Sequence, residues 1–341
     1  MSESNRQYLI TLDNLAAFKE DISESIDALD AVKILNLQDV EGVSNSLAQI
    51  DNAVYSESSI ALGKKNKVGS WGYKIQEFTF NENGEIIIKT NTNHGLTEAI
   101  KGKAISIIYR KEFVFTNCGT ISSFTNDTIV IAPNAAVEYP TEPPSDGIDA
   151  YLKFVEYPNL GTIRLDTEGA MAIGYETLAT DYGAVSGGNK STADGAGSIS
   201  VGINNFTGYG ASSFGGQNKS MARYSSTENF NNAVYAEKAH AEGSNNIIGK
   251  TAISAHVEGH QNKVRKDISS YHLNNAGEIL PTANHVEGYS NIDNGIYSHI
   301  EGQSCEISAG VYRAHAGGQG VQIGSAGHDS FGHGRHLKIN K

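Results

Sequence analysis

The sequence predicts a mainly β protein built around a β-solenoid, and three observations carry this prediction. Glycines recur about every 14 residues through the second half of the 341-residue chain. The tetrad His-x-Glu-Gly occurs four times, at residues 240–243, 256–259, 285–288 and 299–302. The residues four positions before these glycines are mostly Ala or Ser, and side chains two apart on a strand point the same way. A 14-residue unit cannot bury an apolar face alone, so the units must stack as a solenoid with a narrow interior.

Residues 1–57 are predicted to form an N-terminal anchor that contains a helix over about 13–35. Apolar side chains there fall on the a and d positions of a heptad repeat, with Ser25 as the one break; they are Leu15, Phe18, Ile22, Leu29 and Val32. Two interpretations stay open. The helix is either a short trimeric coiled coil or an amphipathic helix packed on another part of the protein.

Residues 58–69 read as a first solenoid turn, after which the pattern stops until Gly174. Strand-like runs separated by turn signals such as Asn83-Gly84 occupy the interval, at 73–80, 85–90, 104–110, 112–116 and 128–132. We therefore expect a small β-barrel or sandwich over 70–157, inserted into the solenoid. The Pro-rich stretch 139–147 is its expected exit loop.

Residues 158–341 are predicted to form the main solenoid. Its corners are assigned to the recurring glycines, which are Gly63, Gly174, Gly188, Gly202, Gly216, Gly243, Gly259, Gly288, Gly302, Gly318 and Gly332. Asn229 fills the gap between Gly216 and Gly243, because Asn also tolerates the left-handed conformation. Further corner residues are expected at Asn204, Asn218, Asn231, Asn245, Asn262 and Asn291. The wide spacing from Gly259 to Gly288 predicts a protruding hairpin over about 268–283.

The positions three and one before each glycine should face outward, and their character changes along the chain. Early turns carry apolar residues there, and later turns carry His and Glu. An exposed apolar stripe on a solenoid usually marks an interface. The interface candidates are Met171, Ile173, Val185, Ile199, Val201, His240, Glu242, His256, Glu258, His285, Glu287, His299, Glu301 and His315.

The motifs AMAIG at 170–174, SISVG at 198–202 and SSIALG at 58–63 resemble the head domain of trimeric autotransporter adhesins. That family's head is a left-handed parallel β-roll of 14-residue turns with an S-V-A-I-G type strand. The resemblance covers about half of the chain. It implies a homotrimer in which the outward apolar positions pack against the other two chains, and it leaves the His/Glu turns as a departure from the family pattern.

The Ser-His-x-Glu-Gly form of the repeat is similar to fibre proteins of tailed bacteriophages, which are made in the host cytoplasm. A signal peptide and an apolar run long enough for a membrane span are not visible in the sequence, which suits such proteins. The resemblance implies a short homotrimeric fibre on the virion surface. A capsid-anchored head fibre with an adhesive role is preferred, anchored through its N-terminal region to another virion protein and contacting a host-surface glycan or protein. A tail or baseplate receptor-binding protein is the alternative, and a polysaccharide-degrading tailspike is a minor one.

The chemistry expected of the chain is structural. A net charge of −12 argues against a nucleic-acid partner, and two cysteines cannot build a disulfide framework. The zinc motifs H-E-x-x-H and P-C-x-x-C are absent from the sequence. We therefore expect no catalytic residues, no cofactor and no metal site. The histidines are expected to form His–Glu hydrogen-bonded ladders, with a metal ion on a trimer axis as the less favoured alternative.

Overall fold

A computed structural model describes residues 52–55, 58–90, 94–109, 113–136, 150–155, 161, 163–165 and 167–340. The helix predicted over 13–35 and the loop predicted over 139–147 lie outside these residues. Within the described part of the chain the structure is almost entirely β, with one 3-10 turn, η4 (Glu98–Ile100). No helix among the described residues has the length and apolarity to cross a bilayer.

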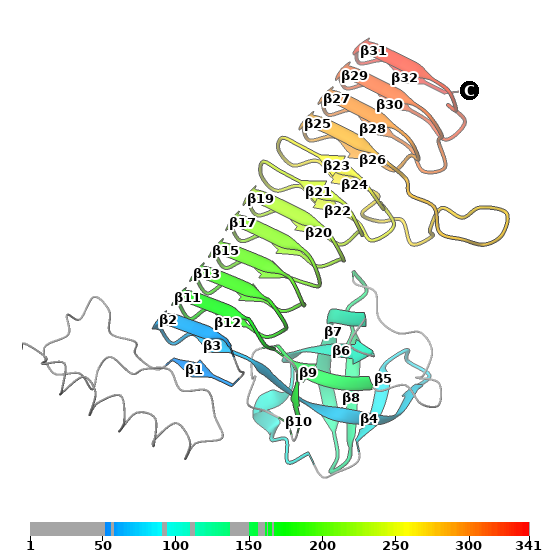
Figure 1. Ribbon diagram of the computed structural model, residues 1–341. Coiled ribbons are helices and arrows are strands. Elements are labelled where there is room, and N and C mark those ends of the chain that lie inside the picture. Colours follow the sequence, from blue (N-terminus) through cyan, green and yellow to red (C-terminus); the bar gives the residue numbers. More distant parts are fainter. Residues whose placement is uncertain are drawn as a thin grey trace, which may run out of the picture.

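The solenoid consists of two parallel sheets, one on each side of a narrow interior (Figure 1). The first, called the long-strand sheet, is made of β2 (Ile60–Lys64), β11 (Met171–Tyr175), β13 (Val185–Asn189), β15 (Ile199–Ile203), β17 (Ser212–Gly216), β19 (Ser226–Phe230), β21 (His240–Ala241), β23 (His256–Val257), β25 (His285–Tyr289), β27 (His299–Gln303), β29 (His315–Gln319) and β31 (Phe331–Arg335). The second, called the short-strand sheet, has only two-residue strands. They are β1 (Ala53–Val54), β3 (Lys67–Val68), β12 (Leu178–Ala179), β14 (Thr192–Ala193), β16 (Phe206–Thr207), β18 (Lys219–Ser220), β20 (Ala233–Val234), β22 (Ile247–Ile248), β24 (Lys263–Val264), β26 (Ile292–Asp293), β28 (Glu306–Ile307), β30 (Gln322–Ile323) and β32 (Lys338–Ile339). The predicted solenoid of about 14-residue turns is confirmed.

The glycines align in one column along the long-strand sheet, with two corrections to the predicted set. Gly215, not Gly216, pairs with Gly202, and Gly334, not Gly332, pairs with Gly318. Gly215 and Gly334 have φ of 104° and 151°, so they adopt the backbone conformation that favours glycine. Asn229 pairs with Gly215 and has φ of 71°, so it does take the place of a glycine.

A set of buried asparagines joins adjacent turns from inside the solenoid. Each of seven buried asparagines donates its side-chain amide to a backbone oxygen of a neighbouring turn. We call these residues the asparagine ladder. They are Asn66, Asn205, Asn218, Asn232, Asn246, Asn262 and Asn291. Asn218, Asn262 and Asn291 were predicted at corners, which are instead formed by Gln217, Gln261 and Ser290 with positive φ. Asn204, Asn231 and Asn245 have positive φ and do lie at corners.

The interior of the solenoid changes character along its length. In the first turns the apolar core is built almost entirely of alanines, such as Ala61, Ala172 and Ala193. In the later turns it is built of larger side chains, such as Ile248, Val286 and Ile300. The later turns therefore bury far more apolar surface within one chain than the first turns do.

The described residues between 70 and 165 form an antiparallel insert between the first turn and the second. Its strands are β4 (Ser70–Phe80), β5 (Ile86–Thr90), β6 (Ala104–Tyr109), β7 (Phe113–Phe124), β8 (Thr128–Pro133), β9 (Ala150–Phe154) and β10 (Ile163–Leu165). The strand order is β10-β4-β5-β8-β7-β6-β9, and an additional β4–β9 pairing joins the two sides of the sheet around a core of Ile, Phe and Leu side chains. Strands β9 and β10 were not predicted, and β7 runs eight residues past the end of its predicted run at 116.

The insert is fastened to the solenoid by a buried ionic cluster. Lys153 of β9 has no exposed side-chain surface, and its Nζ lies 2.9 Å from Asp181 Oδ2 and 3.1 Å from Asp194 Oδ1. Asp194 also accepts hydrogen bonds from Ser106 of β6 at 2.7 Å and from Thr180 at 2.7 Å. Both aspartates belong to the solenoid, so this cluster fixes how the insert sits on the first turns (Figure 1).

The wide interval between Gly259 and Gly288 contains a protruding loop. Leu273 and Ile279 form an isolated antiparallel bridge, and Leu280 N–H donates to His272 O across it. Both apolar side chains of the bridge are exposed. The loop does not interrupt the solenoid, because β23 and β25 still pair directly.

Candidate functional site

The candidate site is the outer surface of the long-strand sheet, where the same two positions of each strand face outward in register. We call the first position of each strand, three before the aligned glycine, the first outer column. It runs Ile60, Met171, Val185, Ile199, Ser212, Ser226, His240, His256, His285, His299, His315 and Phe331. The position one before the glycine is the second outer column. It runs Leu62, Ile173, Gly187, Val201, Phe214, Glu228, Glu242, Glu258, Glu287, Glu301, Gly317 and His333.

All fourteen interface candidates named from the sequence fall in these two columns. The structure adds Ile60, Leu62 and Phe214 to the apolar part and His333 to the polar part. Phe214 faces outward and Ser213 inward because Gly215 is the aligned glycine; counting from Gly216 would exchange the two faces. Ile203 and Phe230, just beyond the aligned column, extend the exposed apolar surface.

The apolar half of this surface has its large side chains outside and its small ones inside. Ile199 and Val201 of β15 are each 38% exposed, whereas Ser198 and Ser200 of the same segment are fully buried. The same inversion holds at β11, where Ala172 is buried and Ile173 is exposed. Soluble monomers rarely expose a contiguous apolar patch of this kind, so the surface has the character of an interface.

The polar half of the first outer column is a row of five neighbouring imidazoles, which we call the imidazole stack. His256, His285 and His299 lie face to face, and the contacts to His240 and His315 are edge-on. Ring centroids of consecutive histidines from His240 to His315 lie 5.2, 5.0, 4.8 and 4.7 Å apart. Burial lowers the pKa of His256 below its ordinary 6.5, and the neighbouring His240 and His285 lower it further. Burial likewise lowers the pKa of His299, assisted by His285 and His315. These two rings therefore favour the neutral form.

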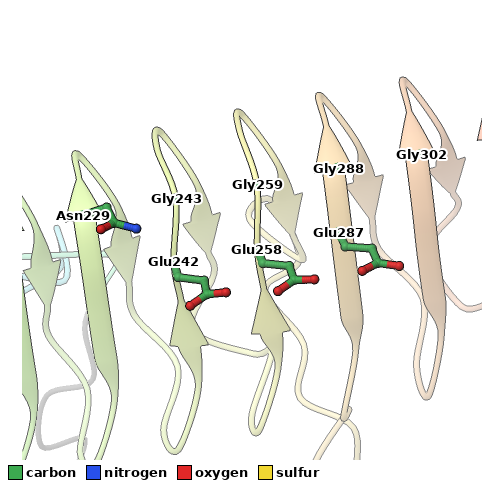
Figure 2. Close-up of a pocket in the computed structure, with 8 residues that line it drawn as sticks. All are labelled: Asn229, Glu242, Gly243, Glu258, Gly259, Glu287, Gly288 and Gly302. Carbon is green, nitrogen blue, oxygen red and sulfur yellow. The ribbon is translucent and has the colours of Figure 1, made fainter.

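The second outer column carries a row of carboxylates beside the imidazoles. Figure 2 shows Glu242, Glu258 and Glu287 projecting from successive turns in the same direction. With the aligned glycines they line an open groove of about 510 Å³. Each carboxylate therefore has another carboxylate one turn away, as the direct pairing of Glu287 with Glu301 illustrates.

The predicted His–Glu hydrogen bonds are not made among the described residues. His240 Nε2 lies 3.7 Å from Glu242, and His299 Nε2 lies 3.9 Å from Glu287 of the preceding turn. Both distances exceed a hydrogen bond. The rings instead contact one another along the column, and the buried Nε2 atoms of His285, His299 and His315 have no hydrogen-bond partner in the described chain.

Comparisons of this chain with protein-family models, with curated proteins and with solved structures found no match. The functional argument therefore starts from the surface itself. Its apolar half is suited to packing against another protein surface, and its polar half presents imidazole nitrogens and carboxylates together.

Proposed function

We propose that the chain is a structural subunit that associates with two further copies of itself through the outer surface of the long-strand sheet. The observation that carries the proposal is the inverted distribution of side chains in the first turns. Alanines and serines fill their interior, while Ile60, Ile173, Ile199 and Val201 lie partly exposed outside. A partner that covers that surface would bury apolar area that a single chain leaves exposed.

The two outer columns also suit self-association because they run along the whole length of the solenoid. Their residues stay in register from β2 to β31, so a second solenoid lying alongside meets the same type of residue turn after turn. Apolar contacts would then fill one half of the interface and stacked imidazoles with carboxylates the other half. The resemblance of 170–174 and 198–202 to trimeric adhesin heads favours three copies and a left-handed roll.

We further propose that the trimer is a short fibre on the surface of a tailed-phage virion, made in the host cytoplasm. The solenoid already begins at β1 (Ala53–Val54), inside the anchor expected over 1–57. In this proposal the N-terminal region before β1 binds a capsid protein, and the remainder is displayed as a head fibre that contacts the host surface. The four His-x-Glu-Gly turns, one of which has the full Ser-His-x-Glu-Gly form at 298–302, support the fibre assignment. The stacked turns support it as well, because they make a rod-like body (Figure 1). The proposed role is structural and adhesive, without catalysis or a cofactor.

The insert and the 273–279 loop favour an attachment role over a pure spacer. Both depart from the solenoid and present surface away from the proposed interface, with Leu273 and Ile279 exposed. The same feature suits the alternative, a receptor-binding protein of the tail or baseplate.

Electron microscopy of virions labelled with gold-conjugated antibody against the chain tests the location. Label on capsids is the expected result, and label at the tail tip supports the alternative instead. Virions that carry the protein at neither place would overturn the fibre assignment. Binding of the purified protein to host cells, and separately to capsids that lack it, then distinguishes attachment from anchoring.

A further inference from the structure

The C-terminal end of the columns holds a cluster that differs from the turns before it. Glu301 of β27, His315 of β29 and His333 of β31 come from three successive strands, and their ligand-type atoms all lie within 4.8 Å of one another. Glu301 Oε1 lies 3.5 Å from His315 Nε2 and 3.8 Å from His333 Nδ1. Two imidazole nitrogens and one carboxylate oxygen thus converge on one point.

A missing side chain makes this convergence possible. In the second outer column Glu301 and His333 are separated by one position, which is Gly317. A Cβ at Gly317 would lie 2.5 Å from His333 Nδ1 and 3.2 Å from Glu301 Oε1. Neither φ nor a tight turn requires glycine there, since Gly317 lacks the positive φ of its neighbour Gly318. The space above Gly317 is instead occupied by the two side chains that lean toward each other.

His315, the third residue of the cluster, has a ring nitrogen without a partner. His315 Nε2 is buried and has no hydrogen-bond partner among the described residues. Phe331 packs on the His315 ring at a centroid distance of 4.8 Å and lies parallel to the His333 ring at 6.4 Å, so an aromatic ring flanks both imidazoles. A buried imidazole nitrogen with no partner is costly unless something binds it.

The two separations from Glu301 come close to those between metal ligands. Zinc binds imidazole nitrogen and carboxylate oxygen at about 2.0–2.2 Å, which places two ligands of a tetrahedral ion about 3.3 Å apart. The observed 3.5 and 3.8 Å exceed a hydrogen bond yet come within a small side-chain adjustment of that spacing.

We propose that Glu301, His315 and His333 bind one divalent transition-metal ion of the zinc class. Two nitrogen donors select such an ion over Mg²⁺ and Ca²⁺, which prefer oxygen ligands. Three protein ligands leave a coordination position open toward solvent or a neighbouring surface. One chain supplies all three ligands, so this site is independent of the proposed trimer.

The three other His/Glu groups on this surface are weaker candidates because each offers only one imidazole nitrogen donor. Each combines a single histidine with two carboxylates, as in Glu258, His285 and Glu287. Neighbouring groups share carboxylates, because Glu258, Glu287 and Glu301 each belong to two of them, so the second histidine is what sets the Glu301 group apart. The second histidine is found only at the Glu301 group within the described chain, where Gly317 opens the column.

Zinc titration of the full-length, chelator-treated protein by isothermal calorimetry tests the site, and visible absorption on adding Co²⁺ reports direct ligation. We expect one Zn²⁺ per chain and no comparable binding of Mg²⁺. His333→Ala should weaken zinc binding by at least about tenfold, because even residues that only support metal ligands contribute that much. Gly317→Val should weaken it similarly by filling the gap.

His328→Ala is the matched control, since His328 is an exposed histidine of the same end of the chain that belongs to none of the groups. It should bind zinc as the wild type does. Circular dichroism and the melting temperature without metal confirm that each variant is folded. Equal zinc affinity in wild type and His333→Ala, or no zinc binding by the wild type, would overturn the proposal.

Discussion

Single asparagines determine how the turns of this solenoid are joined. Asn262 accepts the backbone N–H of Asn291 at 2.9 Å and donates its amide to Glu258 O at 2.8 Å and Gly288 O at 2.9 Å. Its own N–H donates to Asn246 Oδ1. One fully buried side chain therefore satisfies backbone groups of its own turn and of the next, where water cannot reach them.

Asn262→Ala should destabilise the protein strongly, because it leaves several buried backbone groups without partners. We expect a loss of about 3 kcal/mol or more in the free energy of unfolding, at roughly 1–3 kcal/mol for each unsatisfied group. Urea denaturation followed by circular dichroism measures it. Asn83→Ala, at an exposed turn of the insert, should change stability little; a similar small change at Asn262 would contradict the role of the ladder.

Cys305 stands where the next asparagine of the ladder would be. Its N–H donates to Asn291 Oδ1, but its thiol only approaches Gly318 O at 3.5 Å. Cys305→Asn should add amide hydrogen bonds to Glu301 O and Gly318 O and raise the free energy of unfolding by about 1 kcal/mol. Cys305→Ala is the control and should lower it. A melting temperature for Cys305→Asn below that of Cys305→Ala would contradict this prediction.

The sequence identified the asparagine-rich segments after the glycines, but not which asparagines lie at corners and which belong to the ladder. Corner and ladder positions are adjacent, and a 14-residue period does not distinguish neighbours. The same ambiguity displaced Gly216, because Gly215 and Gly216 are consecutive and one turn there has 13 residues rather than 14. Only the backbone pairing separates the two.

At the scale of elements, strand β9 stands out because it carries a fully buried lysine. Lys153 lies in a strand whose other side chains are mostly apolar, and it is fully buried against Asp181 and Asp194. Burial alone would lower the pKa of Lys153, but the two carboxylates outweigh it and raise the pKa above the ordinary 10.5. The lysine is therefore charged, and it pairs with both carboxylates through which the insert is attached, although its single charge balances only one of them. Burial raises the pKa of Asp181, and Lys153 opposes that rise.

Lys153→Met should destabilise the protein by about 3–5 kcal/mol, because removing one partner leaves buried, uncompensated charge. Thermal unfolding of the insert and the solenoid together measures the effect. Lys153→Met combined with Asp181→Asn and Asp194→Asn should recover part of the loss. A single variant as stable as the wild type would mean that the cluster does not hold the insert in place.

The strands of the insert illustrate where sequence patterns stop being informative. Alternating apolar runs indicated β4, β5, β6 and β8 within a few residues. β9 was missed because its lysine interrupts the apolar pattern, and the aspartates that explain it lie 28 and 41 residues away in another element. β10 has only three residues.

For the molecule as a whole, the imidazole stack makes stability depend on pH. The pKa of His256 and His299 lies below 6.5 in the folded chain, so the folded state binds fewer protons than the unfolded state near that value. Their contribution is complete above pH 6.5 and is lost as the pH falls through the lower folded pKa. The groups facing the two rings are His240, His285, His315, Glu242, Glu258 and Glu301.

Melting temperatures between about pH 8 and about pH 5 test this, since imidazoles titrate in that range. The wild type should lose more stability on acidification than the double variant His256→Gln, His299→Gln. Other buried groups contribute equally to both proteins, so the difference isolates the stack. Parallel pH profiles of the two proteins would contradict the prediction.

The repeating architecture could be predicted because one pattern recurs in every turn, so errors at single turns average out. The outward columns followed from that pattern and the two-residue alternation of strands. The cluster at Glu301, His315 and His333 could not be predicted, because it depends on an absent side chain at Gly317 and on register across three turns. The number of chains in the assembly stays a prediction.

The mass of the purified protein in solution, measured by light scattering, tests the central claim most directly. We predict three times the 36.4 kDa chain mass for the wild type, and a lower mass for Val201→Glu, which puts a charge in the apolar half of the surface. The matched control is Ile292→Glu on the short-strand sheet, where a side chain of similar exposure, 36% against 38%, faces away from the proposed interface. That variant should keep the wild-type mass. A wild-type mass of 36.4 kDa would contradict the account, because the exposed apolar columns would then have no second copy to cover them.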